Sequence, residues 1–545
     1  MKKRILTLAL ATSLGVSVLT GCGGQPASPS TGANTPTPSV SASATPSVQP
    51  EGYNGSDNLK VSESPVTMTL FSAFGGNGAP KSDMPVWQKA AEITNVTVEN
   101  VANESISDDQ QSFSTMLASG QLPDIIQGQR TILSPVLSQG VFIALDDLIN
   151  QYAPNVKKFL EDFPDAVNAG TGPDGKLYTL TGTLGGEPGK ALPSMGFFIR
   201  QDWLDTLGLK MPTTLEEFKN VLYAFRNNDP NGNQKKDEIP YFYRDKGVWP
   251  LLQLWDAHNE WYVGADDKVY FGRMSEEYKD ALIELAQWYK DGIIDPEIFT
   301  RGSQARQFLL GNDLGGVTVD WFASTGQMND SLKEQNSKLN FVAMAPPADV
   351  NGVVKIDQSR APIHAYAWGI SRDCKDPVTA IKYLDFWFSE SGTLLRNFGI
   401  EGEHYEIVNG EPTPLEVALS NPAGFPNFLR SIGAGYEIGA YGSLVAEVIT
   451  MNKQAREGFE LYEKSTWIQP PFPTLVLNEE EQKLKDANWT NIMALSDEYL
   501  QSALMGAVDI EATWESHLAQ LDKMNLSKVV EGYNSAYERY KVSGK

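Results

Sequence analysis

Three segments near the start of the folded region decide the fold class: VTMTLF (66–71), DMPVWQKAAEIT (83–94) and VTVENV (96–101). The first and last are rich in β-branched residues that alternate with polar ones, which predicts two strands. The middle segment, which carries an aromatic residue, predicts a helix near Met84 to Thr94 between the two strands. A strand, a helix and a second strand in this order predict a βαβ unit. We therefore expect α/β lobes with covered sheets.

Helix-start signals recur further along the chain. Thr214 and Glu217 have the spacing of a capping box, which predicts a helix after Thr214. Ser275 is the expected N-cap of a second helix, and Asp376 with Pro377 opens a third that we expect to run as far as Gly392. On the first helix the apolar face is expected at Leu215, Phe218, Leu222 and Phe225.

The N-terminal region has the pattern of an exported, lipid-anchored protein. Three basic residues precede an uncharged run over 5–19, which predicts a signal peptide over 1–21 and is too short to span a bilayer. Leu19-Thr20-Gly21-Cys22 resembles the lipobox of bacterial lipoproteins, so Cys22 is the expected acylated residue. Residues 22–64 are mostly small residues and Pro, which predicts a disordered tether.

The size, cysteine count and charge of the chain limit its possible fold and partners. About 480 residues exceed the usual capacity of one hydrophobic core, so two lobes are expected. Cys374 is the only other cysteine, and with Cys22 acylated no intrachain disulfide can form. The formal charge is −24, and removal of the three basic signal residues would leave −27. Such an acidic chain argues against nucleic acid as a partner and says nothing against sugars.

The stretch NNDPNGNQKKDEIP (227–240) places oxygen-bearing side chains at alternate positions around Gly232. A hard cation such as calcium collects six or more oxygen ligands in this way, although the glycine and the closing acid are not at their EF-hand positions. A polar surface turn is the alternative. The predicted ligands are Asp229, Asn231, Asn233, Asp237 and Glu238, with Lys235 contributing its backbone carbonyl.

Several long stretches resemble one known family. They are MLASGQLPDII (116–126), IRQDWLDTLGLKMPTTLEEF (199–218), DPNGNQKKDEIP (229–240), NFGIEGEHYEIVNG (397–410) and NSAYERY (534–540). Together they resemble the family 1 extracellular solute-binding proteins of ABC importers, in the branch with LplA-like lipoproteins and alginate-binding proteins. In that branch the loop that matches 229–238 is a calcium site.

The resemblance implies a periplasmic-binding-protein-like fold of type II, with two α/β lobes and the ligand in the cleft between them. It places the first lobe at 66–180 and 358–405 and the second lobe at 181–357 and 406–545. It also implies a monomer that works with the transmembrane subunits of an ABC permease and meets the membrane only through its lipid anchor.

Aromatic side chains are the candidate sugar platforms, because sugar rings present an apolar face and a rim of hydroxyls. GGVTVDW (315–321) delivers Asp320 and Trp321 at the end of a predicted strand, where α/β sheets tend to meet ligands. Arg360, at an expected crossing between lobes, has a carboxylate or a ligand hydroxyl as its expected partner. Further candidates for the ligand site are Trp255, Trp261, Tyr366, Trp368, Tyr436, Trp467 and Phe74, whereas Trp87, Trp203, Trp288, Trp387 and Trp514 are expected in the core.

The favoured function is capture of an oligosaccharide outside the cell and its delivery to a permease. No catalytic residues are expected, because the sequence shows no nucleophile motif and its four histidines lack metal-ligand spacing. A peptide-binding protein, an adhesin or signalling lipoprotein, and a glycan-active enzyme are the alternatives.

Overall fold

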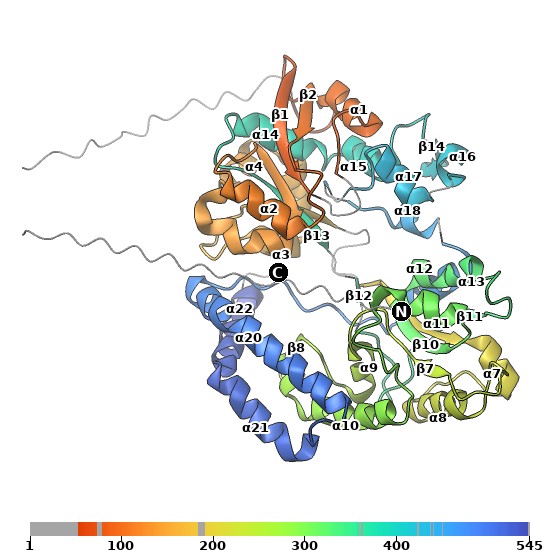
Figure 1. Ribbon diagram of the computed structural model, residues 1–545. Coiled ribbons are helices and arrows are strands. Elements are labelled where there is room, and N and C mark those ends of the chain that lie inside the picture. The colour runs from red at the N-terminus through yellow and green to blue at the C-terminus, as the bar shows by residue number, and fades with distance from the viewer. Residues whose placement is uncertain are drawn as a thin grey trace, which may run out of the picture. The chain divides into compact units, whose positions relative to one another are not determined.

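The computed structural model describes residues 53–73, 79–183, 191–357, 359–360, 363–421, 424–436, 438–439, 441–449 and 451–542 (Figure 1). The predicted signal peptide, Cys22 and most of the predicted tether lie outside these residues, as does Phe74. Within the described ranges, none of the helices combines the length and apolar composition that a membrane span requires.

The first lobe is built on a five-stranded sheet with the order β2-β1-β3-β13-β4. Strand β1 (Val66–Ser72) pairs in parallel with both β2 (Val96–Asn100) and β3 (Ile125–Gln129), which confirms the βαβ prediction. Strand β13 (Ile363–Ile370) arrives from much later in the chain and runs antiparallel to β3 and to β4 (Leu180–Thr183). The first lobe is therefore assembled from two separate parts of the sequence.

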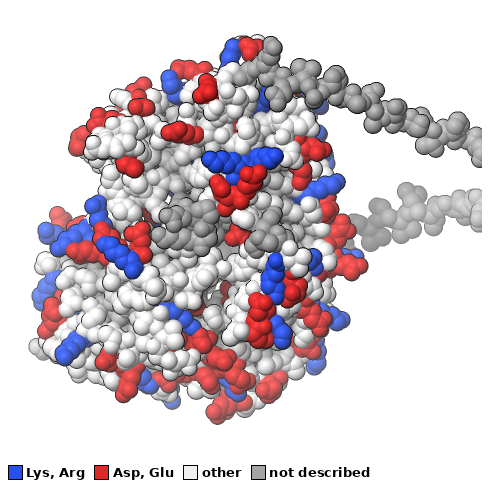
Figure 2. Space-filling model, turned by 180° about the vertical axis from the view of Figure 1, so that it is seen from behind, with Lys and Arg blue, Asp and Glu red and all other residues white. Residues whose placement is uncertain are grey.

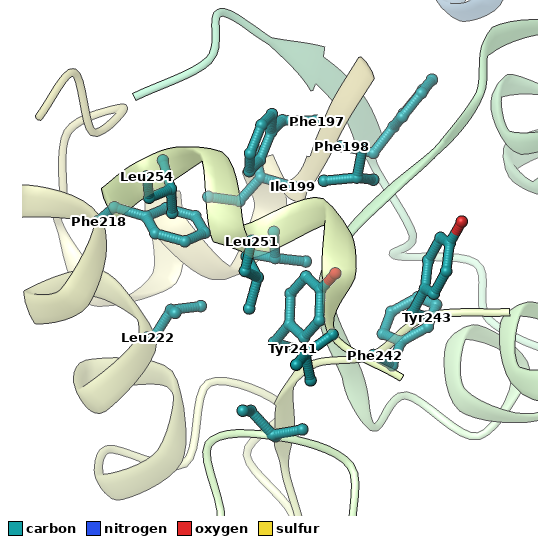
Figure 3. Packing of buried hydrophobic residues seen from close by; sticks show 14 of the residues in the cluster. Phe197, Phe198, Ile199, Phe218, Leu222, Tyr241, Phe242, Tyr243, Leu251 and Leu254 are labelled. Carbon is teal, nitrogen blue, oxygen red and sulfur yellow. The ribbon is translucent and has the colours of Figure 1, made fainter. Parts of the chain in front are cut away.

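The second lobe is built on a four-stranded sheet with the order β11-β6-β10-β7. Strand β6 (Met195–Arg200) lies antiparallel to β10 (Gly315–Trp321) and to β11 (Phe341–Met344), and β7 (Ile239–Tyr241) is parallel to β10. Figure 3 shows aromatic and aliphatic side chains of β6, β7 and the helices α8 and α9 packed together in its core. The fold class is thus α/β with two lobes, as expected.

Helices cover both sheets. In the first lobe they are α1 (Pro85–Thr94), α2 (Asp109–Ala118), α3 (Arg130–Leu133), α4 (Asp146–Tyr152), α5 (Pro154–Asp162), α6 (Pro164–Gly170), α14 (Pro377–Phe386), α15 (Glu390–Phe398), α16 (Glu416–Leu419) and α17 (Phe425–Ser431), with the hairpin β14–β15 (Tyr405–Val408 and Glu411–Pro414). In the second lobe they are α7 (Gln201–Leu207), α8 (Leu215–Asn227), α9 (Trp249–Leu252), α10 (Glu276–Lys290), α11 (Ala305–Gly311), α12 (Phe322–Gly326), α13 (Met328–Ser331), α19 (Lys453–Glu463), α20 (Glu479–Leu504), α21 (Ile510–Lys523) and α22 (Leu526–Val542), with the hairpin β8–β9 (Trp261–Val263 and Val269–Phe271).

The helix-start signals were mostly right. Thr214 accepts a hydrogen bond from the backbone N–H of Glu217, and Ser275 caps α10 in the same way. The capping box is incomplete, because the Glu217 carboxylate accepts from Thr213 instead of from the N-cap backbone. The helix that begins at Pro377 ends at Phe386, and α15 begins separately after its N-cap Ser389. The prediction of one helix as far as Gly392 was therefore wrong.

The lobe boundary after residue 405 needs correction. Ala418, Phe425, Phe428 and Ile432 are buried in the core of the first lobe, although the sequence assigned them to the second. The α17 end is tied to α1, because the Trp87 indole N–H donates to the Gly433 carbonyl at 3.1 Å. The chain returns to the second core only at Met451 and Ala455. Apolar residues do not reveal which of two cores they join, which is why sequence patterns missed this.

Three segments lead between the two cores. One contains β5 (Leu192–Pro193), which pairs antiparallel with β12 (Ser359–Arg360) of the next crossing. The third contains α18 (Leu444–Val448), between the last core residue of the first lobe and Met451. The first two crossing segments are thus joined by backbone hydrogen bonds.

A buried carboxylate holds the start of the described chain against the first lobe. Asp385 is fully buried and accepts from the Tyr53 hydroxyl at 2.5 Å, the Asn155 amide at 2.9 Å and the Val156 N–H at 2.7 Å. Burial raises the pKa of Asp385 to about 6, and the three donors act in the opposite direction. A negative charge on the buried Asp385 carboxylate is stabilised only when all three donors are present.

We expect Tyr53→Phe to destabilise the protein by about 1–3 kcal/mol at about pH 8 and by less at about pH 5. The folded pKa of Asp385 is above its unfolded value of 3.8, so the stability that this group contributes is full below that value and is lost as the pH rises through about 6. Urea unfolding at the two pH values measures the difference. Tyr152→Phe on α4 is the control, and equal losses at both pH values would contradict the role of Asp385.

Candidate ligand site and metal loop

Strand β10 delivers the leading candidate, Trp321, to the surface of the second lobe. The strand can enter the sheet because a Cβ at Gly316 would meet the Pro240 carbonyl oxygen at 2.8 Å, so glycine is needed there. Every residue of β10 before Trp321 is buried, whereas Trp321 is 38% exposed. The exposed indole lies at the strand end, as the sequence predicted.

Arg360 of crossing strand β12 lies beside this indole. Its guanidinium carbon is 5.7 Å from the Trp321 ring centroid, within the range of a cation–π contact. Its two terminal nitrogens donate to the Glu447 carboxylate of α18 at 2.5 and 2.6 Å. The predicted carboxylate partner is therefore present. The pair connects two crossing segments beside the candidate sugar platform.

Asp320, the residue before Trp321, is fully buried under the platform. Its oxygens lie 2.9 Å from the Arg244 Nε and 3.3 Å from the Arg306 Nε. Burial raises the pKa of Asp320, and the two guanidinium groups partly offset this rise. The placement argues against direct contact with a ligand. Asp320 instead holds Arg244, whose side chain is 25% exposed, at the same strand-end surface.

Three other candidates are core residues, which corrects the expectation for them. Trp255 packs edge-on against Trp288 at 5.6 Å in the second core. Trp368 is 2% exposed in the first core, and Tyr436 is also 2% exposed. Large aromatics are buried more often than not, and Trp368 lies in the part of β13 that is buried on both faces.

The remaining described candidates are partly exposed. The Tyr366 hydroxyl donates to the Asp109 carboxylate of α2 at 3.1 Å, next to Gln129 at the end of β3. Trp467 packs edge-on against Tyr462 at 5.4 Å. Trp261 stacks on Tyr533 of α22 at 3.8 Å. The five tryptophans expected in the core are all buried there.

Sequence reasoning did not select Arg244. It follows β7 by three residues and so belongs to the same edge of the sheet as Trp321, but its contact with Asp320 joins residues 76 positions apart in the chain. The one usable signal was a charged pair, Arg244 and Asp245, directly after the aromatic run 241–243. A strand-end position alone does not separate a ligand contact from a surface charge.

The loop over 229–238 is folded around its own carboxylates. Asp229 and Gly232 take positive φ angles of 48° and 73°, which turn the chain back on itself. The Asp229 carboxylate accepts from the Asn233 N–H at 3.0 Å. The Asp237 carboxylate accepts from the side-chain amides of Asn231 at 3.4 Å and Asn233 at 3.0 Å. Four of the predicted ligands are therefore joined by hydrogen bonds within the loop, whereas no such contact is described for the Glu238 carboxylate or the Lys235 carbonyl.

Glu238 provides the test of whether the loop fits a metal. Its side chain is fully buried, and both carboxylate oxygens lack a hydrogen-bond partner among the described residues. Burial raises the pKa of Glu238, and the nearby Asp237 and Asp229 add to the rise. A buried carboxylate without donors is costly unless a cation balances it. The oxygen ligands of the loop therefore fit calcium. A bound calcium ion would replace the amide N–H groups from which the carboxylates accept hydrogen bonds.

Among the described residues, those of this loop included, no three His, Cys, Asp or Glu side chains lie close enough together to hold a metal ion. The loop differs from such a group because half of its predicted donors are amide or backbone oxygens. Calcium accepts both kinds of oxygen.

The fold and the strand-end site define a two-lobed ligand-binding protein. A model of the bacterial extracellular solute-binding protein family matches residues 87–396, which is more than half of the chain. The chain therefore belongs to this family of bacterial extracellular solute-binding proteins.

Among curated proteins, the chain is 25% identical over 467 residues to the fructooligosaccharide ABC transporter substrate-binding protein FusA of Streptococcus pneumoniae, covering 78% of this chain and 82% of FusA. It is 24% identical over 304 residues to the polygalacturonan/rhamnogalacturonan-binding protein YtcQ of Bacillus subtilis, covering 54% and 58%. Both relatives are named as proteins that bind sugars.

Among solved structures, the alginate-binding protein AlgQ2, determined without calcium ion, superposes with a TM-score of 0.75 at 31% identity, over 88% of this chain and 99% of AlgQ2. FusA in complex with kestose gives a TM-score of 0.69 at 21% identity, over 88% and 100%, which supports the fold alone. Another FusA structure is of an EF-hand mutant.

We expect Asp320→Asn to destabilise the second lobe by about 3 kcal/mol, because Arg244 and Arg306 would lose the charge that balances them. Trp321→Ala, one residue further along β10, removes a partly exposed ring and should change unfolding far less. Urea denaturation of both variants measures this contrast. Similar stability of Asp320→Asn and the wild type would show that the buried carboxylate is not needed.

Proposed function

We propose that the protein is the extracytoplasmic, lipid-anchored substrate-binding component of an ABC importer, which captures an oligosaccharide and delivers it to a permease. The observation that carries the proposal is the exposed Trp321 at the end of β10, held beside Arg360 of a crossing segment. An aromatic face with a polar rim suits a sugar ring. The sugar-binding relatives point in the same direction.

The crossing segments supply the conformational step. A ligand that contacts both lobes favours hinge closure about such segments, and closure lets a permease distinguish loaded from empty protein. Strands β5 and β12 are short, and Arg360 of β12 forms an ion pair with Glu447 of α18. In this proposal the protein acts as a monomer, Cys22 carries the acyl anchor, and the chain between Cys22 and Tyr53 forms the tether. The predicted end of the tether at residue 64 is corrected to Tyr53, because Tyr53 and Val61 already pack on the first lobe.

The surface charge is compatible with a neutral sugar. On the face drawn in Figure 2, acidic and basic side chains are intermixed over the surface, without a basic area that extends over a lobe. The chain as a whole carries 68 acidic and 44 basic residues, which disfavours nucleic acid as a partner.

Binding is tested by intrinsic tryptophan fluorescence and melting temperature against oligosaccharides, uronates and peptides. A shift with oligosaccharides is expected. A shift with peptides only would identify a peptide-binding protein, glycan cleavage would identify an enzyme, and capture of a protein without any of these would identify an adhesin.

Trp321→Ala should weaken oligosaccharide binding by about 1–3 kcal/mol, because the ring loses its stacking platform. Phe308→Ala is the matched control, since Phe308 is an exposed aromatic at 47% that packs on Arg301 of the same lobe. Isothermal titration measures both affinities. Equal affinity of the Trp321 variant and the wild type would remove Trp321 from the site.

We further propose that Asp229, Asn231, Asn233, Asp237, Glu238 and the Lys235 carbonyl hold a calcium ion. The buried, donor-free carboxylate of Glu238 supports this. A bound calcium ion would supply charge balance and rigidity to the loop. Because all these residues belong to one loop, the ion is expected to stabilise the second lobe without contact to the sugar.

Stability should then rise with free calcium, by about 2.7 kcal/mol at a hundredfold excess over Kd. Chelator should lower the melting temperature, and magnesium should restore it poorly because it requires octahedral geometry. Asp237→Ala should abolish the response, whereas Asp280→Ala, at an exposed position of α10, should retain it. A melting curve that chelator leaves unchanged, in metal-free protein, would identify an ordinary turn.

A further inference from the structure

A buried arginine of the first lobe contacts the segments that lead between the lobes. Arg396 lies near the end of α15 and is 5% exposed. Its Nε donates to the Tyr436 carbonyl at 3.1 Å, and its Nη1 donates to the Tyr441 carbonyl at 3.0 Å. Its Nη2 lies 2.7 Å from the Nε2 of His364. One guanidinium group therefore joins the start of the third crossing segment to β13, which follows the second.

Asn397, the next residue of α15, contacts the same crossing segment. Its side-chain amide donates to the Tyr441 carbonyl at 2.8 Å and accepts from the Ser443 N–H at 2.9 Å. The Gly442 N–H, between these two residues, donates to the Thr183 carbonyl at 3.0 Å. Thr183 is the last residue of β4, from which the first crossing segment leaves. The first-lobe ends of the three crossing segments are thus joined at α15.

The contacts of Arg396 reach the candidate ligand site through β12. His364 follows Arg360 of that strand by four residues. Arg360 in turn contacts the Trp321 ring and pairs with Glu447 of the third crossing segment. The position of Arg360 beside Trp321 therefore depends on how the crossing segments are held at the first lobe.

His364 has to be neutral for this arrangement to exist. A guanidinium group can only donate hydrogen bonds, so the Nε2 of His364 accepts from Arg396 and carries no proton. Burial lowers the pKa of this imidazole well below its ordinary value of 6.5. The positive charges that lower the pKa further are those of Arg396 on α15, Arg130 on α3 and Arg360 on β12. The stability that neutral His364 contributes is therefore full above about pH 6.5 and is lost as the pH falls below that value.

We propose that Arg396 is a positioning residue for ligand binding, which holds the first-lobe ends of the crossing segments, and that neutral His364 is its acid-sensitive partner. Protonation of His364 removes its hydrogen bond with Arg396 and loosens the crossing segments. Arg360 is then no longer fixed beside Trp321. The inference rests on the proposed function and adds to it a control of ligand affinity by pH.

The first test is amide hydrogen exchange of the ligand-free protein, measured by mass spectrometry. Arg396→Gln should raise exchange in residues 441–449 by about tenfold, because that segment loses a side chain that ties it to the first lobe. Exchange in α10, in the core of the second lobe, should stay as in the wild type. Arg372→Gln is the matched control, because Arg372 is a half-exposed arginine of the first lobe that donates to the Gly140 carbonyl.

The second test measures the Kd of neutral fructooligosaccharides between about pH 7.5 and about pH 5 by isothermal titration. Wild-type affinity should fall by about tenfold over this range, because each pH unit below 6.5 favours the protonated, loosened arrangement by up to about tenfold. His364→Gln should bind as the wild type does at about pH 7.5 and lose this pH dependence, since glutamine keeps an acceptor but does not titrate. His404→Asn is the control and should retain the pH dependence, because His404 accepts from the Ile400 N–H within the first lobe.

The outcomes separate this inference from the proposed function. Faster exchange confined to 441–449 in Arg396→Gln, with a pH dependence that His364→Gln removes, supports the inference. Unchanged exchange in 441–449, or exchange raised equally in α10, overturns the positioning role of Arg396. An equal pH dependence of the wild type and His364→Gln overturns the role of His364.

Two further results are decided by the same measurements. If the wild type binds no fructooligosaccharide, the proposed function fails for these sugars, and exchange in 441–449 of the wild type and His364→Gln at the two pH values still decides the inference. If Arg396→Gln does not fold, as judged by circular dichroism, the comparison of the wild type with His364→Gln decides it.

Discussion

The Arg360 side chain is 8% exposed, and the arrangement around the candidate site depends on how its charge is balanced. A buried charge is tolerated only when it is paired and hydrogen-bonded. Glu447 provides that pairing with two hydrogen bonds from another crossing segment, and the Trp321 ring lies on the other side of the contact. The platform at the end of β10 is therefore attached to the segments about which the lobes are expected to move.

The second constraint is the close fit of β10 in its sheet. Gly315 and Gly316 let the strand start against Phe242 and the Pro240 backbone, where a Cβ would be 2.7 to 2.8 Å from its neighbours. The strand then remains buried as far as Asp320, whose carboxylate lies against Arg244 and Arg306. Trp321 is exposed because the strand ends there. The exposed position of Trp321 thus depends on where β10 ends and on the buried Asp320 carboxylate that pairs with Arg244 and Arg306.

Local patterns predicted the elements well because their causes are local. Residue alternation identified β1 and β2, and Thr214 and Ser275 capped the helices that follow them. The helix from Pro377 was predicted too long, because it ends at Phe386 and Ser389 caps a new helix directly afterwards. The proposed calcium ligands could be selected in advance for the same reason as the caps, since ten consecutive residues contain all of them.

Local sequence patterns did not predict the contacts between residues that are far apart in the chain. Trp255, Trp368 and Trp321 have similar sequence surroundings, and only the assembled sheets show that the first two are buried and the third is exposed. Likewise, nothing local assigns Phe425 and Phe428 to the first core after the chain has crossed twice.

By itself the sequence determined the α/β class and the family resemblance, and it predicted a signal peptide, an acylated cysteine and a calcium loop, because each of these depends on neighbouring residues. Only the tertiary structure decided which aromatics face outward, that Arg360 pairs with Glu447, and that Asp320 holds Arg244, since these contacts join residues far apart in the chain.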